Sequence, residues 1–305
     1  MRLGVVVGGS DSETLDEAVD ALVAAEKAGF HSAWRANIFG LDALTVLALA
    51  GARTSRIELG TAVVPTYPRH PHALAQQAAT TNAATNGRLV LGIGRSHQVV
   101  IESMFGLQYD KPITHMREYV AVLKGLFDDG AVSLDGKQYK VHAPLTVPGG
   151  AKVPVMIGAL MPKMLELCGT LCDGTLTWMS GPGYIAKTVV PCLRAASEKA
   201  GREMPRVVVS LPVCVTDDKA AAHAFAAKQF EIYGTLPVYR ACLDAEGAAG
   251  PADVALIGSE DEVRAGLEKV KASGASDFYA GVFPESAGAD TARTSECLAG
   301  IGAAL

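Results

Sequence analysis

A glycine-containing turn near the middle of the chain is the first candidate for chemistry. Residues 158–161 (GALM) join an apolar run to a helical pattern that begins at Pro162. Such a turn directs several backbone N–H groups at one point, and the helix dipole adds about half a positive charge there. The turn from Gly158 to Met161 therefore predicts a phosphate or carboxylate site, although an ordinary strand-to-helix turn would have the same pattern.

A second candidate follows another apolar run, where Gly94, Arg95, Ser96 and His97 are consecutive. Glycine lets a ligand approach the backbone closely. Arg95 and Ser96 could hold an anion, and His97 could exchange a proton near neutral pH. A lone histidine is more often a structural hydrogen-bonding residue, so its position at the end of a predicted strand is what favours a chemical role.

A third segment, residues 60–65 (GTAVVP), ends a strand in small and β-branched residues. It could press flat against a planar ring, and it could equally be ordinary packing. The sequence does not favour a metal site. His70 and His72 stand at a predicted helix start, which is typical of capping. Cys168 and Cys172 have no further ligands nearby and are expected to be buried packing thiols.

Short apolar runs alternate with helical patterns along the chain. Eight runs predict buried strands, at residues 3–8, 31–37, 57–64, 88–94, 153–158, 174–179, 207–215 and 277–282. Helices are predicted at 42–53, 71–84, 162–171, 184–200 and 219–233, with capping pairs Ser10–Glu13 and Ser259–Glu262. This order predicts an α/β fold, a closed (β/α)₈ barrel with its active site at the carboxyl ends of the strands. An open doubly wound sheet is the alternative, but no G-x-G-x-x-G follows the first strand.

The runs on either side of Asp135 and Gly136 alternate in polarity, which predicts a β-hairpin over residues 132–141, inserted after the fourth strand. No linker or low-complexity stretch divides the chain, so residues 1–305 are expected to form one domain.

The composition narrows the class of protein. With 49% hydrophobic and 19% charged residues, the chain has material for a large core and is not a disordered protein. The net charge is −5 and the basic residues are scattered, so nucleic-acid binding is not expected. No apolar stretch reaches membrane-spanning length and no secretory signal is visible, so a cytoplasmic protein is expected.

The same segments carry a resemblance to a known family. Residues 59–94 (LGTAVVPTYPRHPHALAQQAATTNAATNGRLVLGIG) resemble the central signature of the luciferase-like flavin and deazaflavin oxidoreductases. Residues 154–179 (PVMIGALMPKMLELCGTLCDGTLTWM) resemble their second signature. The similarity extends over nearly the whole chain and is closest to the actinobacterial branch that uses coenzyme F420, an 8-hydroxy-5-deazaflavin.

The resemblance implies that the deazaflavin lies at the carboxyl end of a (β/α)₈ barrel. It also implies a non-prolyl cis peptide bond behind the ring, at Ala62–Val63 or its neighbour, and hydride transfer to or from a small organic substrate. His97 would be the proton donor or acceptor, and Phe39 and Trp178 would lie on the substrate side. The residues implied to contact the cofactor are Gly8, Asn37, Ala62, Val63, Val64, Gly94, Arg95, Ser96, Gly158, Ala159, Leu160 and Met161.

Two other interpretations remain open. One is an FMN-dependent monooxygenase on the same fold, and the other is a non-catalytic member that binds a flavin or deazaflavin. Members that oxidise glucose 6-phosphate carry His and Trp after the second strand and Glu after the fourth, where this chain has residues 37–39 (NIF) and 96–97 (SH). That activity is therefore not expected. Members of the family are commonly dimers, which implies a homodimer here.

Overall fold

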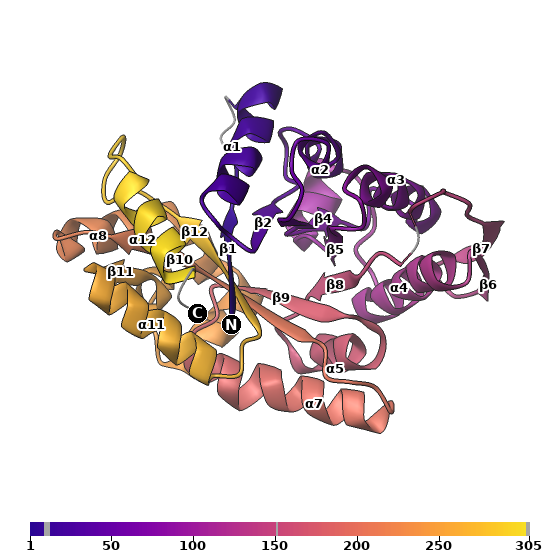
Figure 1. Cartoon of the computed structure of the whole chain (residues 1–305). Coiled ribbons are helices and arrows are strands. Elements are labelled where there is room, and N and C mark those ends of the chain that lie inside the picture. The colour runs from indigo at the N-terminus through magenta and orange to yellow at the C-terminus, as the bar shows by residue number, and fades with distance from the viewer. Residues whose placement is uncertain (9–12, 151, 303–305) are drawn as a thin grey trace.

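Eight parallel strands close into a barrel in the computed structural model, which describes residues 1–8, 13–150 and 152–302 (Figure 1). Around the barrel the order is β1-β2-β3-β5-β8-β9-β10-β12, and β12 pairs with β1 to complete the ring. The short strand β4 continues the line of β3 and pairs with β5. The bounds are β1 Arg2–Val6, β2 Ser32–Arg35, β3 Glu58–Thr61, β4 Val64–Pro65, β5 Leu89–Gly94, β8 Val155–Gly158, β9 Gly174–Trp178, β10 Arg206–Val215 and β12 Asp277–Val282. The predicted barrel is confirmed.

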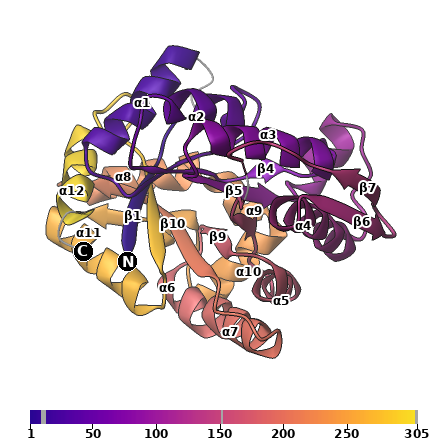
Figure 2. The ribbon, with the colours of Figure 1, turned by 45° about the vertical axis from the view of Figure 1, so that its right-hand side comes forward.

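Helices surround the strands on the outside (Figures 1 and 2). The helices that follow barrel strands are α1 Leu15–Lys27, α2 Ala43–Gly51, α3 Pro71–Ala84, α4 Pro112–Asp128, α5 Pro162–Leu171, α7 Val190–Lys199, α8 Lys219–Gln229, α11 Glu260–Ala272 and α12 Ala292–Gly302. Three of them, α3, α4 and α5, begin with proline, whose fixed φ and missing N–H suit the first helical turn. Within the described ranges, no helix is long and apolar enough to cross a bilayer.

The capping pair predicted for the first helix was wrong. Thr14 caps α1, and Glu17 completes the capping box through its contacts with the Thr14 N–H and hydroxyl, each at 2.8 Å. The carboxylate of Glu13 instead forms an ion pair with Arg35 at 2.6 Å. Ser10 lies outside the described residues. The other predicted pair, Ser259–Glu262, does cap α11.

The predicted hairpin is present as β6 (Ala131–Asp135) and β7 (Lys140–Pro144). Glu118 on α4 holds its connection, because its carboxylate accepts the backbone N–H groups of residues 137–139 at 2.7 to 2.9 Å. The hairpin therefore packs against the outside of the barrel rather than over its mouth.

Several elements were not predicted, and most lie near the carboxyl ends of the strands. The predicted helix over 184–200 starts earlier and comprises α6 (Pro182–Tyr184), a π-helical turn and α7. The predicted helix over 219–233 stops at Phe230, where the chain turns. The additional elements are a π-helical turn at Val100–Met104, α9 Glu231–Thr235, α10 Pro237–Glu246, a 3-10 turn at Pro251–Val254 and β11 Leu256–Gly258.

Two apolar layers hold the barrel together. The larger one lies between the strands and the surrounding helices. The other fills the barrel interior and comprises Trp34, Val90, Met156, Leu176, Val208 and Tyr279. Because side chains alternate along a strand, residues two positions beyond these also face the interior. The residues of the interior layer therefore show which side chains near the mouth point into the barrel.

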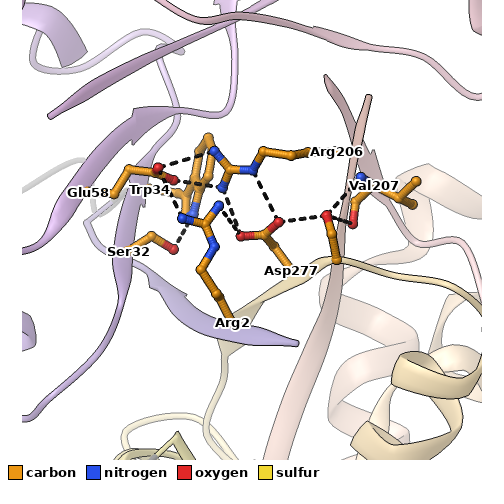
Figure 3. A network of polar contacts seen from close by, with 8 residues as sticks. Arg2, Ser32, Trp34, Glu58, Arg206, Val207 and Asp277 are labelled. Carbon is orange, nitrogen blue, oxygen red and sulfur yellow. Dashed lines mark hydrogen bonds and ion pairs between the residues drawn. The ribbon is translucent and has the colours of Figure 1, made fainter. Parts of the chain in front are cut away.

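A network of charged side chains closes the amino-terminal end of the barrel (Figure 3). Arg206 on β10 contacts Glu58 on β3 and Asp277 on β12, both at 2.8 Å. Arg2 on β1 contacts Asp277 at 2.7 Å and Glu58 at 3.4 Å. In the ring order β3 and β10 are opposite each other, so Arg206 reaches across the full width of the barrel floor.

Candidate active site

Strand three contributes an irregular segment to the carboxyl end of the barrel. A cis peptide bond between Ala62 and Val63 separates β3 from β4, at the position that the family resemblance implied. Just before it, the Thr61 hydroxyl donates to the Gly92 carbonyl at 2.7 Å and accepts from the Gly92 N–H at 2.9 Å. These bonds to β5 fix where Ala62 and Val63 enter the mouth, and both residues are half-buried there.

Val63 faces two positions that have no side chain. A Cβ on Gly94 would lie 2.5 Å from Val63 Cγ2, and a Cβ on Gly158 would have no neighbour closer than 3.8 Å. Val64, the next residue, is buried and pairs with Ile93 in the sheet. Val63 therefore packs on Gly94 and lies near Gly158, between strand three, β5 and β8, and we call these three residues the cradle.

The turn from β8 to α5 presents amide groups rather than carbonyls. The Thr175 hydroxyl donates to the Ala159 carbonyl at 3.1 Å, and the Tyr184 hydroxyl donates to the Leu160 carbonyl at 2.8 Å. No side chain caps α5 at Met161, so the first N–H groups of this helix have no side-chain acceptor. This arrangement fits the anion site expected from the sequence.

The segment after β5 places three polar side chains beside the cradle. Ser96 has a left-handed backbone with φ of 60°, which turns the chain sharply after Gly94. The Arg95 guanidinium lies 5.9 Å from the centre of the Tyr109 ring and forms no ion pair within the described part of the chain. Burial, and then the charge of Arg95, lower the pKa of His97 below its usual value of 6.5. His97 is therefore mostly neutral at neutral pH.

Three of the expected residues are engaged elsewhere. The Asn37 side-chain oxygen accepts the Ala43 N–H at 3.0 Å, so it helps to hold the start of α2. Gly8 has φ of 81° and lies against Arg35, since a Cβ there would overlap the guanidinium. Phe39 is 61% exposed on the loop after β2 and meets Phe105 edge to face at 6.4 Å. None of these three contacts involves Val63, Gly94 or Gly158.

Phe39 belongs to an exposed apolar rim formed by the loops after β2 and β5. The large apolar side chains exposed there are Ile38, Phe39, Val99, Met104, Phe105 and Leu107. So many exposed apolar side chains on two loops are more typical of an entrance for an apolar molecule than of an ordinary solvated surface.

Trp178 ends β9 and is half-buried, packed over Gly281 of β12. Its ring meets Tyr233 of α9 edge-on at 5.9 Å, and Tyr233 meets Tyr239 of α10 at 5.0 Å. Tyr239 in turn lies 6.1 Å from His97. Neither tyrosine was predicted for the site. Tyr233 stood at the end of the helix predicted over 219–233, and α10, which carries Tyr239, was not predicted, although Pro237 is a typical first residue of a helix.

A metal centre has no support in the ranges that the structure describes, where no group of three or more candidate ligand side chains gathers. Cys168 and Cys172 are both buried, and the Cys168 thiol donates to the Gly174 carbonyl at 3.1 Å. Burial and the neighbouring Cys172 raise the pKa of Cys168. These two residues pack against β9, as expected from the sequence.

The fold and the mouth define a (β/α)₈ barrel with an interrupted third strand, a glycine-lined cradle and an amide-rich turn. The sequence profile of the luciferase-like monooxygenases matches residues 1–277, and the chain belongs to that family. A Mycobacterium tuberculosis protein with the provisional name of coenzyme F420-dependent oxidoreductase is 30% identical over 302 residues, which covers 93% of this chain and 85% of that protein.

Solved structures show the same fold at lower sequence identity. An F420-dependent secondary alcohol dehydrogenase in complex with an F420-acetone adduct superposes with a TM-score of 0.81 at 18% identity, covering 98% of this chain and 97% of that one. The oxygenating constituent of 3,6-diketocamphane monooxygenase from Pseudomonas putida, in complex with FMN, superposes with a TM-score of 0.77 at 17% identity, covering 98% and 96%. Both cofactor classes thus occur on this fold.

Proposed function

We propose that the protein is a coenzyme F420-dependent oxidoreductase that transfers a hydride between the deazaflavin and a small organic substrate. The observation that carries the proposal is the cradle of Val63, Gly94 and Gly158, where two positions at the barrel mouth lack side chains and expose backbone that a flat ring could approach. The relative from M. tuberculosis with an F420-dependent name supports the choice of cofactor. When bound, F420 supplies a ring carbon, C5, that donates or accepts a hydride and does not activate oxygen.

The residues around the cradle would hold the cofactor through its ring, side chain and phosphate. Ala62, Val63 and Val64 would lie behind the ring. The N–H groups of the β8–α5 turn, together with Arg95 and Ser96, offer donors and positive charge for the phosphate. Gly8 and Asn37, which also contact Arg35 and the start of α2, belong to the proposed set. The full set is Gly8, Asn37, Ala62, Val63, Val64, Gly94, Arg95, Ser96, Gly158, Ala159, Leu160 and Met161.

His97 would move the proton that accompanies hydride transfer. Because its pKa is lowered, the imidazole is mostly neutral at pH 7 and is suited to accept a proton from a substrate hydroxyl. Trp178 and Phe39 would contact the substrate, Trp178 at the mouth and Phe39 on the exposed rim. This assignment is compatible with both directions of hydride transfer, since the same residue returns the proton in reverse.

A titration of the purified protein with F420 and, separately, with FMN tests the cofactor. We expect micromolar or tighter binding of F420, followed by its fluorescence, and much weaker binding of FMN. Preference for FMN would instead favour the monooxygenase chemistry of the P. putida structure. If neither cofactor binds, the proposal is wrong. If F420 binds but no substrate ever changes its absorbance near 420 nm, a non-catalytic binding protein is favoured.

Replacing Gly94 by alanine tests the cradle. The new Cβ would lie 2.5 Å from Val63 Cγ2, so Val63, which is proposed to lie behind the ring, must shift from its place. We expect the Kd for F420 to rise by about tenfold or more while the circular dichroism spectrum is unchanged. Gly300→Ala in α12 is the matched control, because a Cβ at Gly300 would have no neighbour within 4 Å. Equal F420 affinity in both variants would place the ring elsewhere.

We also propose that the protein is a cytoplasmic homodimer. Leu15 on α1 and Leu49 on α2 are large apolar side chains that are 39% and 44% exposed. A second copy could cover them without blocking the barrel mouth, because α1 and α2 lie on the outside of the barrel (Figure 2).

A further inference from the structure

One wall of the barrel mouth is formed by polar-tipped side chains from three neighbouring strands. In the sheet register Ser210 of β10 is level with Trp178 of β9 on one side and with Tyr279 of β12 on the other. Trp178 and Ser210 lie two positions beyond the interior residues Leu176 and Val208, so they face the barrel interior with Tyr279. The three side chains therefore form one layer of the barrel, next to the mouth.

Two tyrosines from the helices beyond β10 complete this wall. Tyr233 meets Trp178 edge-on, and Tyr239 meets Tyr233 edge-on. Burial first, and then the neighbouring Tyr233 and Tyr279, raise the pKa of Tyr239, which places the three phenols together. We call Trp178, Ser210, Tyr233, Tyr239 and Tyr279 the indole–phenol pocket.

Two polar atoms of this pocket lack the hydrogen-bond partners that such atoms normally have. Trp178 Nε1 and Ser210 Oγ are buried and have no hydrogen-bond partner among the described residues. Trp178 lies close enough to the Tyr233 phenol, and Ser210 to the Tyr279 phenol, to offset part of the rise in pKa that burial causes in each. Neither contact satisfies Trp178 Nε1 or Ser210 Oγ. Buried polar groups without partners are uncommon, and each one costs free energy.

Elsewhere the same side-chain types are paired. The other indole, that of Trp34, donates to Ser32 Oγ at 2.9 Å. The phenol of Tyr119 donates to the Arg69 carbonyl at 3.0 Å, and Tyr184 donates to a carbonyl at 2.8 Å. The indole of Trp178 thus differs from these paired groups, and a ligand can supply its acceptor. Thr177 Oγ1 and Arg202 Nη1 are further buried atoms without a partner among the described residues.

The chemistry of the pocket restricts that ligand. An indole N–H can only donate, so the complementary group must be an acceptor. The five side chains carry no formal charge at neutral pH, because the pKa values of the buried phenols are raised. An anion would lack a cation here and a cation would lack a carboxylate. The aromatic faces, extended by Phe230 at 5.9 Å from Trp178, suit an apolar ring.

We propose that the indole–phenol pocket binds the carbonyl oxygen of an uncharged, ring-bearing substrate through Trp178 Nε1 and the hydroxyls around it. This inference adds a substrate class to the proposed function. Only the reaction that follows binding depends on that function. The pocket itself can be tested without turnover.

The test uses the indole N–H signals of the protein, which has two tryptophans. Protein with ¹⁵N-labelled indoles is titrated, with and without F420, with three matched probe pairs. The pairs are acetophenone and ethylbenzene, cyclohexanone and cyclohexane, and menadione and 2-methylnaphthalene. We expect at least one carbonyl probe to move the Trp178 signal downfield and to bind about tenfold more tightly than its hydrocarbon partner. The Trp34 signal, already bonded to Ser32, is the internal control, and Trp178→Phe assigns the two signals.

Variants that remove single hydroxyls then locate the oxygen. Tyr233→Phe and the double variant Ser210→Ala, Tyr279→Phe should reduce the preference for the carbonyl probe to about threefold or less. Tyr139→Phe, on the hairpin, is the matched control and should retain the preference. The proposal is overturned if no carbonyl probe is preferred over its partner, or if the preference survives both variants. It is also overturned if the variants weaken F420 binding instead, since the pocket would then hold the cofactor. If the unmodified protein does not bind F420 but still prefers the carbonyl probe over its hydrocarbon partner, only the proposed function is contradicted.

Discussion

Replacing His97 by glutamine should lower turnover by roughly 10²–10⁴ while leaving the affinity for F420 nearly unchanged. The reason is that His97 follows Gly94 of the cradle by three residues and its imidazole lies 6.1 Å from the Tyr239 ring, where it would face the substrate rather than hold the cofactor. Stopped-flow absorbance near 420 nm with a carbonyl or alcohol substrate measures turnover, and F420 fluorescence measures binding. His223→Gln is the control, because His223 is exposed and pairs with Asp253 at 3.0 Å.

We expect the rate of alcohol oxidation by the unmodified enzyme to decrease at low pH. Burial and Arg95 lower the pKa of His97, so the imidazole gains its proton only below its usual value of 6.5. For alcohol oxidation the neutral form is active, and the rate should fall as the pH drops through the lowered pKa. Arg95→Gln removes one of the two causes and should move that fall toward higher pH. Turnover that is unchanged in His97→Gln would remove His97 from the mechanism.

Replacing Asp277 by asparagine should destabilise the fold by about 3–5 kcal/mol. The Asp277 side chain is 3% exposed and contacts Arg206 at 2.8 Å and Arg2 at 2.7 Å, so its loss leaves two guanidinium groups facing one carboxylate. For a chain of this length the change corresponds to a fall in Tm of roughly 5–8 °C. Differential scanning calorimetry measures it, and urea unfolding gives the free energy directly.

Arg2→Met is the matched control for the same network. The Arg2 side chain is 45% exposed, and exposed ion pairs contribute less than about 1 kcal/mol. Arg206 holds the pKa of Asp277 below its usual value of 3.8 despite the opposing effect of burial. The stabilisation is therefore complete above that value and is lost as the pH falls through the lowered pKa. A loss that is equal for Arg2→Met and Asp277→Asn would mean that burial at the barrel floor is unimportant.

Local signals explain which elements the sequence could predict. The strand at Asp277–Val282 and the helices at Pro71–Ala84 and Pro162–Leu171 have the predicted bounds, because Pro at the first helical turn and an uninterrupted apolar run mark their ends. The start of α1 was wrong because two capping patterns follow each other there, Ser10 to Glu13 and Thr14 to Glu17. The second pattern is used, and Glu13 contacts Arg35, which is 22 positions away.

The candidate site was predictable only in part, for a related reason. The turn Gly158–Met161 consists of consecutive residues, so it could be recognised in the sequence. The cis peptide bond expected from the family resemblance is present at Ala62–Val63. The indole–phenol pocket combines side chains from β9, β10, β12, α9 and α10, and nothing local connects them. Asn37 was placed near the cofactor by resemblance alone, and its side-chain oxygen accepts the Ala43 N–H at the start of α2. The roles of the site residues and the single domain over residues 1–305 stay predictions.

The charged floor of the barrel has a consequence for how the chain is made. Glu58 is synthesised 148 residues before its partner Arg206, and Asp277 follows another 71 residues later. At about 5–20 residues per second, Glu58 waits roughly 7–30 s for the first of these partners. During that time the sheet is open and has unpaired edges that can join other chains. The ring closes only when β12 emerges and pairs with β1, so the barrel cannot form until the last of its strands has been synthesised.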